Sequence, residues 1–346
     1  MQVIERLELF RKKILLLFIL LSVNSFSQVF PDSSVHQLLK QGIAFIIEQK
    51  YDEAKNVFVQ LDKSRSDVPL GKIYLAALQI TKSYDYETPF NDSLISDYLK
   101  QAKNISEQLL EKDDRNIWNK YFFALTEGYT AYYDALRGSW LQAFSTGLNS
   151  IAAFEDCLEI DNEFNEAYIA LGSYKFWKSK KADFLSWFPI IDDEKELGIS
   201  YLKNAVKNSG YNSHIAIHSL IWIYIEQEEY DKAIETANKV LKEFPNSRIY
   251  KWGLARAYEN IDPLKSAKLY KEILDSYPKN LISNKINRVV LKHLIAQQYV
   301  KVILNHKAIE MCDEILKIKD YTEFEFDKLE NRLDRVRNLK KELLQN

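Results

Sequence analysis

Apolar and small residues recur along the chain at a fixed interval of 34 residues. The interval relates two matching triplets, which are Leu220, Tyr224 and Ala233, then Leu254, Tyr258 and Ala267. Within each interval, apolar residues stand three or four positions apart, which is the spacing of amphipathic helices, and a short polar stretch divides the run in two. The pattern therefore predicts an all-α chain built from antiparallel helix pairs that repeat along the sequence.

A third copy of the pattern lies near the start of the chain, in the stretch "LLKQGIAFIIEQKYDEAKNVFVQLDK". Small residues such as Gly42 and Ala54 let two helices approach, while Phe45 and Phe58 fill the space between units. Pro245 and other prolines end the second helices. In these features the chain resembles the tetratricopeptide repeat family. The resemblance implies an α-solenoid whose first helices line a concave face that takes peptides or partner segments.

The remaining segments extend this architecture over residues 28–320. Residues 71–160 read as two longer helix pairs, and residues 280–319 as a final one, which gives six or seven pairs in all. Residues 321–346 form one amphipathic stretch with a polar outer face, and we expect a helix that caps the last repeat. Its alternative is a coiled-coil seam with a second chain. The predicted apolar face holds Phe326, Leu329, Leu333, Val336, Leu339 and Leu343.

The central repeat carries an insertion at about residues 179–193. In the other units, 12 residues separate the small residue of the first helix from that of the second, whereas Gly172 and Gly198 stand 26 apart. The excess falls in "KADFLSWFPIIDDEKELG", which contains six large apolar residues, namely Phe184, Leu185, Trp187, Phe188, Ile190 and Ile191. Asp193 followed by Glu196 is the pattern of a capping box at the next helix start.

The burial of this insertion stays open at the level of sequence. Packing six apolar side chains on the solenoid stabilises by roughly 12 kcal/mol, whereas ordering fourteen more residues costs on the order of 14–20 kcal/mol. The alternatives are a loop packed on its own solenoid and an exposed apolar site for a partner or membrane surface. The order Gly172, Phe176, Ser186, Phe188-Pro189, Gly198 and Leu202 also resembles the tetratricopeptide repeat domain 39 family. That resemblance implies that the insertion is a family feature.

The N-terminus has the organisation of a secretory signal. Four basic residues precede the apolar run "ILLLFILLSV", and the small residues Ser25 and Ser27 follow it at the spacing that a signal peptidase reads. We expect residues 1–27 to be a signal peptide and the mature protein to begin at Gln28, in the periplasm or cell envelope. The alternative is an uncleaved membrane anchor.

Composition and charge exclude several classes of protein. A hydrophobic content of 47% and a charged content of 28% are typical of a globular chain. A net charge of −2 gives no reason to expect nucleic-acid binding. The two cysteines, Cys157 and Cys312, are interpreted as small buried residues, with a disulfide between them as the alternative in an exported protein.

The sequence contains no recognisable catalytic or metal-binding motif. His214 and His218 stand four residues apart on one helix face, but the glutamate of an HExxH motif and a clear third ligand are missing. Phosphate-loop and nucleophile-elbow motifs are also missing. The sequence therefore predicts a protein that is not an enzyme and needs no cofactor or metal.

The predicted function is binding of a protein or peptide partner by an exported scaffold in the bacterial cell envelope. The alternative is a membrane-surface-associated protein that uses the apolar segment 184–191, and an enzyme is the third reading. Neither the partner nor the oligomeric state follows from the sequence. Aromatic and arginine side chains dominate binding energy at interfaces. On this basis the candidate partner-binding residues are Trp187, Phe188, Phe184, Phe176, Trp177, His218, Trp222, Trp252 and Arg256.

Overall fold

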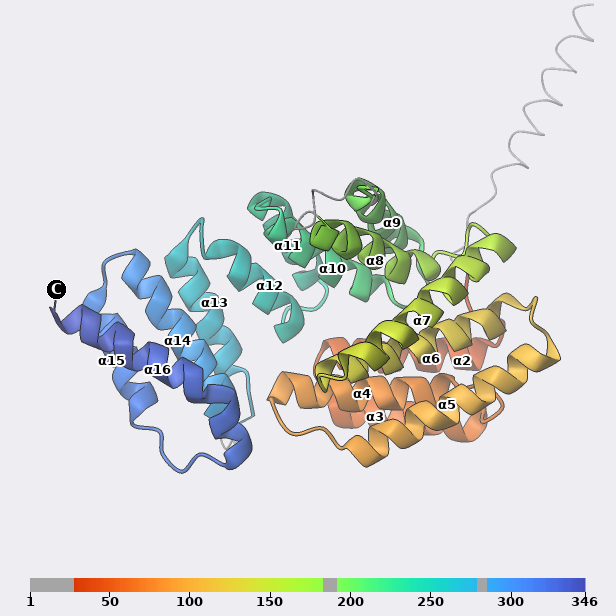
Figure 1. Ribbon diagram of the computed structural model, residues 1–346, viewed down its shortest axis with the longest axis horizontal. Helices are drawn as coiled ribbons and strands as arrows, with labels where there is room; N and C mark the ends of the chain where they lie inside the picture. Colours follow the sequence, from red (N-terminus) through yellow and green to blue (C-terminus); the bar gives the residue numbers. More distant parts are fainter. Residues whose placement is uncertain (1–27, 183–191, 279–284, 346) are drawn as a thin grey trace, which may run out of the picture.

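The computed structural model of the chain describes residues 28–182, 192–278 and 285–345, and within these ranges it contains fifteen α-helices and no strand. Fourteen of the helices form seven successive pairs, as the 34-residue repeat predicts (Figure 1). The pairs are α2 (Ser33–Ile47) with α3 (Tyr51–Ser64), α4 (Leu70–Tyr86) with α5 (Asp92–Lys112), α6 (Ile117–Leu136) with α7 (Trp140–Ile160), α8 (Ala167–Ala182) with α9 (Lys195–Asn208), α10 (Ser213–Glu226) with α11 (Tyr230–Leu241), α12 (Arg248–Tyr258) with α13 (Pro263–Asp275), and α14 (Lys285–Lys301) with α15 (Asn305–Leu316).

Four of the turns that connect paired helices share one backbone conformation. The second residue after the first helix takes a left-handed conformation, with φ between 58° and 79°, which reverses the chain after the last helical turn. The four residues are Gln49, Gly138, Glu228 and Ile303. Only Gly138 adopts this conformation without steric cost, and a β-branched residue such as Ile303 is strained there.

Small residues set the distance between paired helices. Ala54, Ala233 and Ala267 are buried between their helices, as predicted. Helices α8 and α9 approach closely where Gly172 and Gly198 face each other. A Cβ atom added to Gly172 would lie 2.8 Å from the carbonyl oxygen of Gly198, and one added to Gly198 would lie 2.6 Å from that of Gly172. The two glycines that the repeat pattern assigned to the first and second helices of this unit are therefore in contact across the pair.

The connection between α8 and α9 differs from the prediction in its helix start. Helix α9 begins at Lys195, after Glu194, so the capping box of Asp193 with Glu196 does not form. The backbone N–H of Glu194 instead donates to Ser179 Oγ at 2.9 Å, and that of Lys195 donates to Asp193 Oδ1 at 3.1 Å. The apolar residues 184–191 lie outside the described residues.

The last helix, α16 (Glu323–Gln345), packs on α14 and α15 and buries Leu329, Leu333 and Val336. These side chains complete a small C-terminal core with residues of α14 and α15. Phe326, which the spacing placed on the same face, is 44% exposed, whereas its neighbour Glu325 is buried, so the buried face of the first turn is offset by one residue from the prediction. The helix covers the apolar side of the last pair, which is what a cap does in a solenoid.

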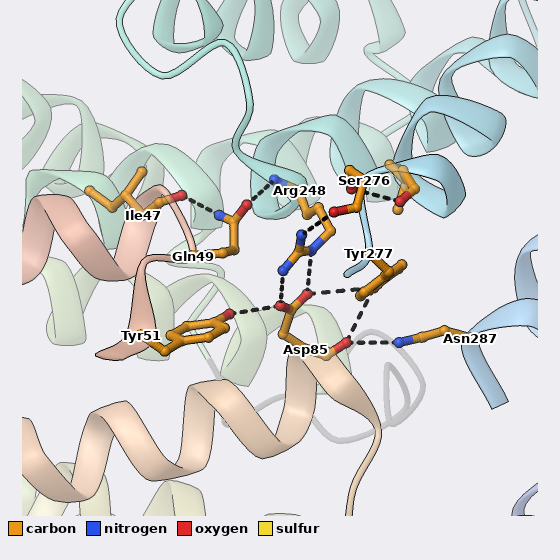
Figure 2. Close-up of polar contacts among 9 residues, drawn as sticks. Ile47, Gln49, Tyr51, Asp85, Arg248, Ser276, Tyr277 and Asn287 are labelled. Carbon is orange, nitrogen blue, oxygen red and sulfur yellow. Dashed lines mark hydrogen bonds and ion pairs between the residues drawn. The ribbon is translucent and has the colours of Figure 1, made fainter. Parts of the chain in front are cut away.

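The solenoid closes on itself through a buried polar cluster, which joins the second helix pair to the sixth and seventh (Figure 2). Arg248, at the start of α12, donates from Nε to Asp85 Oδ1 at 2.9 Å and from Nη2 to Asp85 Oδ2. Tyr51 donates to the same carboxylate at 2.8 Å. The backbone carbonyl of Asp85 accepts from Tyr277 at 3.2 Å and from Asn287 at 2.8 Å. We call these five residues the closure cluster.

A second buried cluster surrounds Glu166, which precedes α8. Its carboxylate accepts from Tyr121 Oη at 3.2 Å, from Asn212 Nδ2 at 2.8 Å and from the backbone N–H of Tyr211 at 2.7 Å. Tyr74 on α4 donates to Asn212 Oδ1 at 3.1 Å. A buried carboxylate is tolerated only when it is hydrogen-bonded, and here the bonds hold the end of the α9–α10 connection against α4 and α6.

Candidate partner-binding surface

Four of the nine predicted binding residues do not form a described surface. Phe184, Trp187 and Phe188 lie outside the described residues. Phe176 is fully buried, so the prediction that it contacts a partner is wrong for this structure. The cause is Gly198, where an added Cβ atom would stand only 3.2 Å from the Cβ of Phe176, so that α9 lies directly over the phenylalanine.

Trp177 and Trp252 are half-buried and pack against the main core. The ring of Trp177 meets that of Phe176 edge-on, with 5.1 Å between centroids. The ring of Trp252 lies 5.5 Å from that of Tyr270 on the partner helix α13. One side of each indole therefore supports the fold, and only the other side is available to a ligand.

His218 and Trp222 form a hydrogen-bonded pair on α10. The indole N–H of Trp222 donates to Nε2 of His218 at 2.9 Å, which places the histidine proton on Nδ1. Desolvation by the surrounding protein lowers the pKa of His218 to about 4 and that of the neighbouring His214 to about 4 as well. Both side chains are nevertheless partly open to solvent. The pair thus presents a neutral aromatic surface with a fixed orientation at neutral pH.

Arg256 is the most exposed of the predicted residues that the structure describes, and its guanidinium is paired with Glu259. Nη1 donates to Glu259 Oε2 at 2.7 Å, and the other oxygen of Glu259 accepts from Tyr270 at 2.6 Å. Burial opposes the charged guanidinium, but Glu259 outweighs it and raises the pKa of Arg256. The side chain is held in place for contact with a ligand on its remaining N–H groups.

Two tyrosines on first helices were not identified from the sequence. Tyr84 on α4 and Tyr132 on α6 are each about half exposed, and their hydroxyl groups are near enough to interact electrostatically. Desolvation, followed by the proximity of Tyr84, raises the pKa of Tyr132 to about 12. The only feature of the sequence that could have identified them is that both lie on first helices, in the segment that matches the repeat weakly.

A group of exposed apolar residues on α7 was also not identified from the sequence. Trp140, Leu141, Phe144 and Leu148 on α7 are 69%, 90%, 68% and 41% exposed. We call these four residues the outer stripe. Its sequence signal was the absence of any charged residue from position 138 to position 154.

The structure also shows the state of the two cysteines and of potential metal ligands among the described residues. Burial raises the pKa of Cys157 to about 12 and that of Cys312 to about 11, so both free thiols stay protonated at neutral pH. Within residues 28–182, 192–278 and 285–345, there is no group of three or more His, Cys, Asp or Glu side chains that could hold a metal ion. Among the helices of this part of the chain, none is long and apolar enough to cross a bilayer.

Comparison with known proteins identifies the repeat. Residues 218–247, which cover most of α10, all of α11 and the approach to α12, match the family model of the tetratricopeptide repeat. The predicted repeat type is therefore confirmed, and the chain folds as an all-α tetratricopeptide-type solenoid. No curated protein sequence matches the chain.

Several solved structures are similar in fold at low sequence identity. A tetratricopeptide repeat protein from Parabacteroides merdae is 12% identical, with 91% of this chain and 100% of that chain covered and a TM-score of 0.40. The human IFIT1 dimer with m7Gppp-AAAA is 14% identical, with 92% and 78% covered and a TM-score of 0.42. The tetratricopeptide repeat domain of P58(IPK) is 15% identical, with 89% and 79% covered and a TM-score of 0.26.

Proposed function

We propose that this tetratricopeptide-repeat solenoid is an exported, non-catalytic scaffold of the bacterial cell envelope that binds a protein or peptide partner on its first helices. Proteins built from this repeat generally bind protein partners. The observation that carries the proposal is the His218–Trp222 pair, a partly exposed indole held by a hydrogen bond of 2.9 Å within the matched repeat. Rigid aromatic side chains of this kind contribute much of the binding energy at interfaces.

The neighbouring first helix supports the same proposal. Arg256 on α12 is held by Glu259, and Trp252 on that helix keeps one side of its ring free of the core. A partner segment across α10 and α12 would then meet an indole, an oriented guanidinium and a second indole. Because both histidines of α10 are neutral at pH 7, the surface favours an apolar or aromatic segment over a purely acidic one.

Affinity capture from a cell-envelope extract, followed by a measured dissociation constant for the purified partner, tests this proposal. We expect Trp222→Ala to weaken binding at least about tenfold, since truncation of a central aromatic anchor costs more than about 1.4 kcal/mol. Leu264→Ser, at an exposed site of α13, is the matched control and should leave affinity unchanged. Equal affinity of Trp222→Ala, Arg256→Ala and the unmodified protein would contradict the proposed surface.

Export is tested separately, by determining the N-terminus of the protein isolated from cells. Cleavage before Gln28 is the expected result, because Ser25 and Ser27 precede it at signal-peptidase spacing. A full-length chain retained in the membrane would support the anchor instead.

The second candidate function is contact with a membrane surface through residues 184–191. Its support is the apolar sequence of that segment, together with exposed basic residues, Lys178 and Lys181, in the last turns of α8 just before it. Replacing Trp187 and Phe188 together with Ser should lower retention on anionic vesicles and leave the melting temperature nearly unchanged. A fall in stability with unchanged retention would make the segment structural.

A further inference from the structure

Helix α7 is packed with its polar and small residues inward and its large apolar residues outward over its N-terminal half. Ser150 and Thr146 are buried, and Ser150 Oγ donates to the carbonyl of Ala124 on α6 at 2.8 Å. A Cβ atom on Gly147 would stand 3.7 Å from the Cβ of Ala131, so small residues bring the two helices together here. Within the described chain, all four residues of the outer stripe are exposed, and none belongs to the buried part of a hydrophobic core.

The reason lies in the unequal lengths of neighbouring pairs. Helices α6 and α7 have 20 and 21 residues, whereas α8 and α9 have 16 and 14. The buried apolar residues of α7 are Ala153, Phe154 and Cys157, all in its C-terminal half. Among the described helices, the next pair thus covers the second half of α7, and none covers the first half. In water, a helix of a soluble protein is expected to place its apolar residues inward, so this arrangement indicates an occupant.

The stripe has the spacing of a helix–helix seam. Leu141, Phe144 and Leu148 follow one another at intervals of three and four residues, and Trp140 lies beside them. An antiparallel copy of the same helix, related by a two-fold axis between Phe144 and Ser145, places Leu141 against the partner's Leu148. The same axis places Phe144 against the partner's Ser145, so that a large side chain meets a small one. The stripe is therefore complementary to itself, as an isologous interface requires.

Charge and area favour a second copy over a membrane surface. The helix carries no charged residue before Glu155, so two copies meet without like charges, whereas nothing on it attracts anionic lipid. The nearest basic residue, Arg137, is already paired with Asp92 at 3.5 Å. Exposed aromatic residues contribute ~150–250 Å² each, so the stripe exposes on the order of 600 Å², close to the ~800 Å² per partner of a standard interface.

We propose that the outer stripe of α7 is a self-association surface, on which two copies of this chain pack antiparallel α7 helices about a two-fold axis beside Phe144. This association uses neither the His218–Trp222 pair nor Arg256, so it stands independently of the proposed partner-binding function.

Sedimentation equilibrium of the purified protein over a range of concentrations tests the proposal. We expect a monomer–dimer equilibrium, and we expect Leu141→Glu and Leu148→Lys each to weaken it at least tenfold, because each places an unpaired charge in an apolar seam. The double variant Leu141→Glu/Leu148→Lys should recover dimerisation, since the antiparallel arrangement brings each carboxylate opposite an ammonium group. Leu264→Glu, on the exposed start of α13, is the matched control and should dimerise normally.

A loss of dimerisation in these variants can be distinguished from a failure to fold. The substituted side chains are 41–90% exposed, so the helical circular dichroism and melting temperature of the diluted variants should stay close to those of the unmodified protein. A protein that stays monomeric up to about 100 μM would overturn the proposal, as would a dimer that both single variants leave intact. Binding of the monomer to lipid vesicles, abolished by Leu141→Glu, would overturn it in favour of a membrane surface.

Discussion

Arg248 and Asp85 stand 163 residues apart in the chain and form a buried ion pair that joins α12 to the end of α4. Their side chains are only 6% and 8% exposed. Burial disfavours the charged guanidinium, but the hydrogen bonds and charge of Asp85 outweigh it and raise the pKa of Arg248. The cluster is fully satisfied around Asp85, whose carboxylate and carbonyl both accept bonds from the opposite end of the solenoid (Figure 2).

The first prediction concerns this pair. Asp85→Asn leaves a buried guanidinium without its counter-ion, so we expect the free energy of unfolding in urea to fall by about 3–5 kcal/mol. The apolar replacement of both partners, Asp85→Leu/Arg248→Met, should recover much of that loss. Asp334→Asn removes an exposed partner of Arg337 and should cost less than about 1 kcal/mol. A similar small cost for Asp85→Asn would show that the closure contributes little to stability.

The second prediction compares glycines within paired helices. An added methyl group at Gly172 or Gly198 meets a facing carbonyl oxygen at 2.8 or 2.6 Å, so either Ala substitution should destabilise by roughly 1–3 kcal/mol as the helices move apart. Gly147→Ala meets only Ala131 at 3.7 Å and should stabilise by about 0.5–1 kcal/mol through helix propensity. Thermal unfolding of the three variants measures the difference. Equal effects at the three sites would mean that α8 and α9 are not in close contact.

The third prediction concerns the strained turn between α14 and α15. Ile303 has φ of 60° and is 82% exposed, so its β-branched side chain strains the backbone and gains little from packing. Ile303→Gly should therefore raise the free energy of unfolding by about 1 kcal/mol, and Ile303→Asn by less. Ile261→Gly, at another exposed isoleucine, serves as the control and should lower stability. A destabilised Ile303→Gly variant would contradict the left-handed turn.

The fourth prediction concerns pH. Burial holds the pKa of His214 and His218 at about 4 in the folded protein, below the ordinary value of 6.5. The unfolded chain therefore binds these protons more readily, and the stability contributed by the neutral rings is complete above pH 6.5 and is lost as pH falls toward 4. Urea unfolding at pH 7.5 and pH 5.0 should show a smaller loss for His214→Asn/His218→Gln than for the unmodified protein. His306→Gln changes an exposed histidine and serves as the control.

The repeat period predicted most of the architecture, because helix pairing is a local property. Spacing of apolar residues, small residues at 12-residue separations and terminal prolines all act within one or two helices. The pairing of Gly172 with Gly198 was predicted from their positions in the repeat alone, although the insertion lengthens their separation to 26 residues. Phe176 was placed on the partner-binding face, whereas the structure buries it, because α9 packs over it at Gly198.

The closure cluster and the outer stripe could not be predicted in the same way. Asp85, Arg248 and Asn287 belong to three different helix pairs. The residues around each of them in the sequence give no indication that the three are in contact. Their meeting depends on the accumulated rotation of the pairs between them. The stripe depends on the length of α8 relative to α7, which is a relation between neighbouring units rather than a pattern inside either helix.

The closure cluster also constrains how this chain can evolve. An open solenoid can gain or lose a whole repeat, because each unit touches only its neighbours. Here the third, fourth and fifth helix pairs lie between Asp85 and Arg248 in the chain. The contact between these two residues fixes the distance that the three pairs must span. Duplication or deletion of one unit between them would carry the arginine away from its carboxylate and leave both charges buried without a partner. A change in repeat number between these two residues is therefore expected to destabilise this chain, unlike an open solenoid.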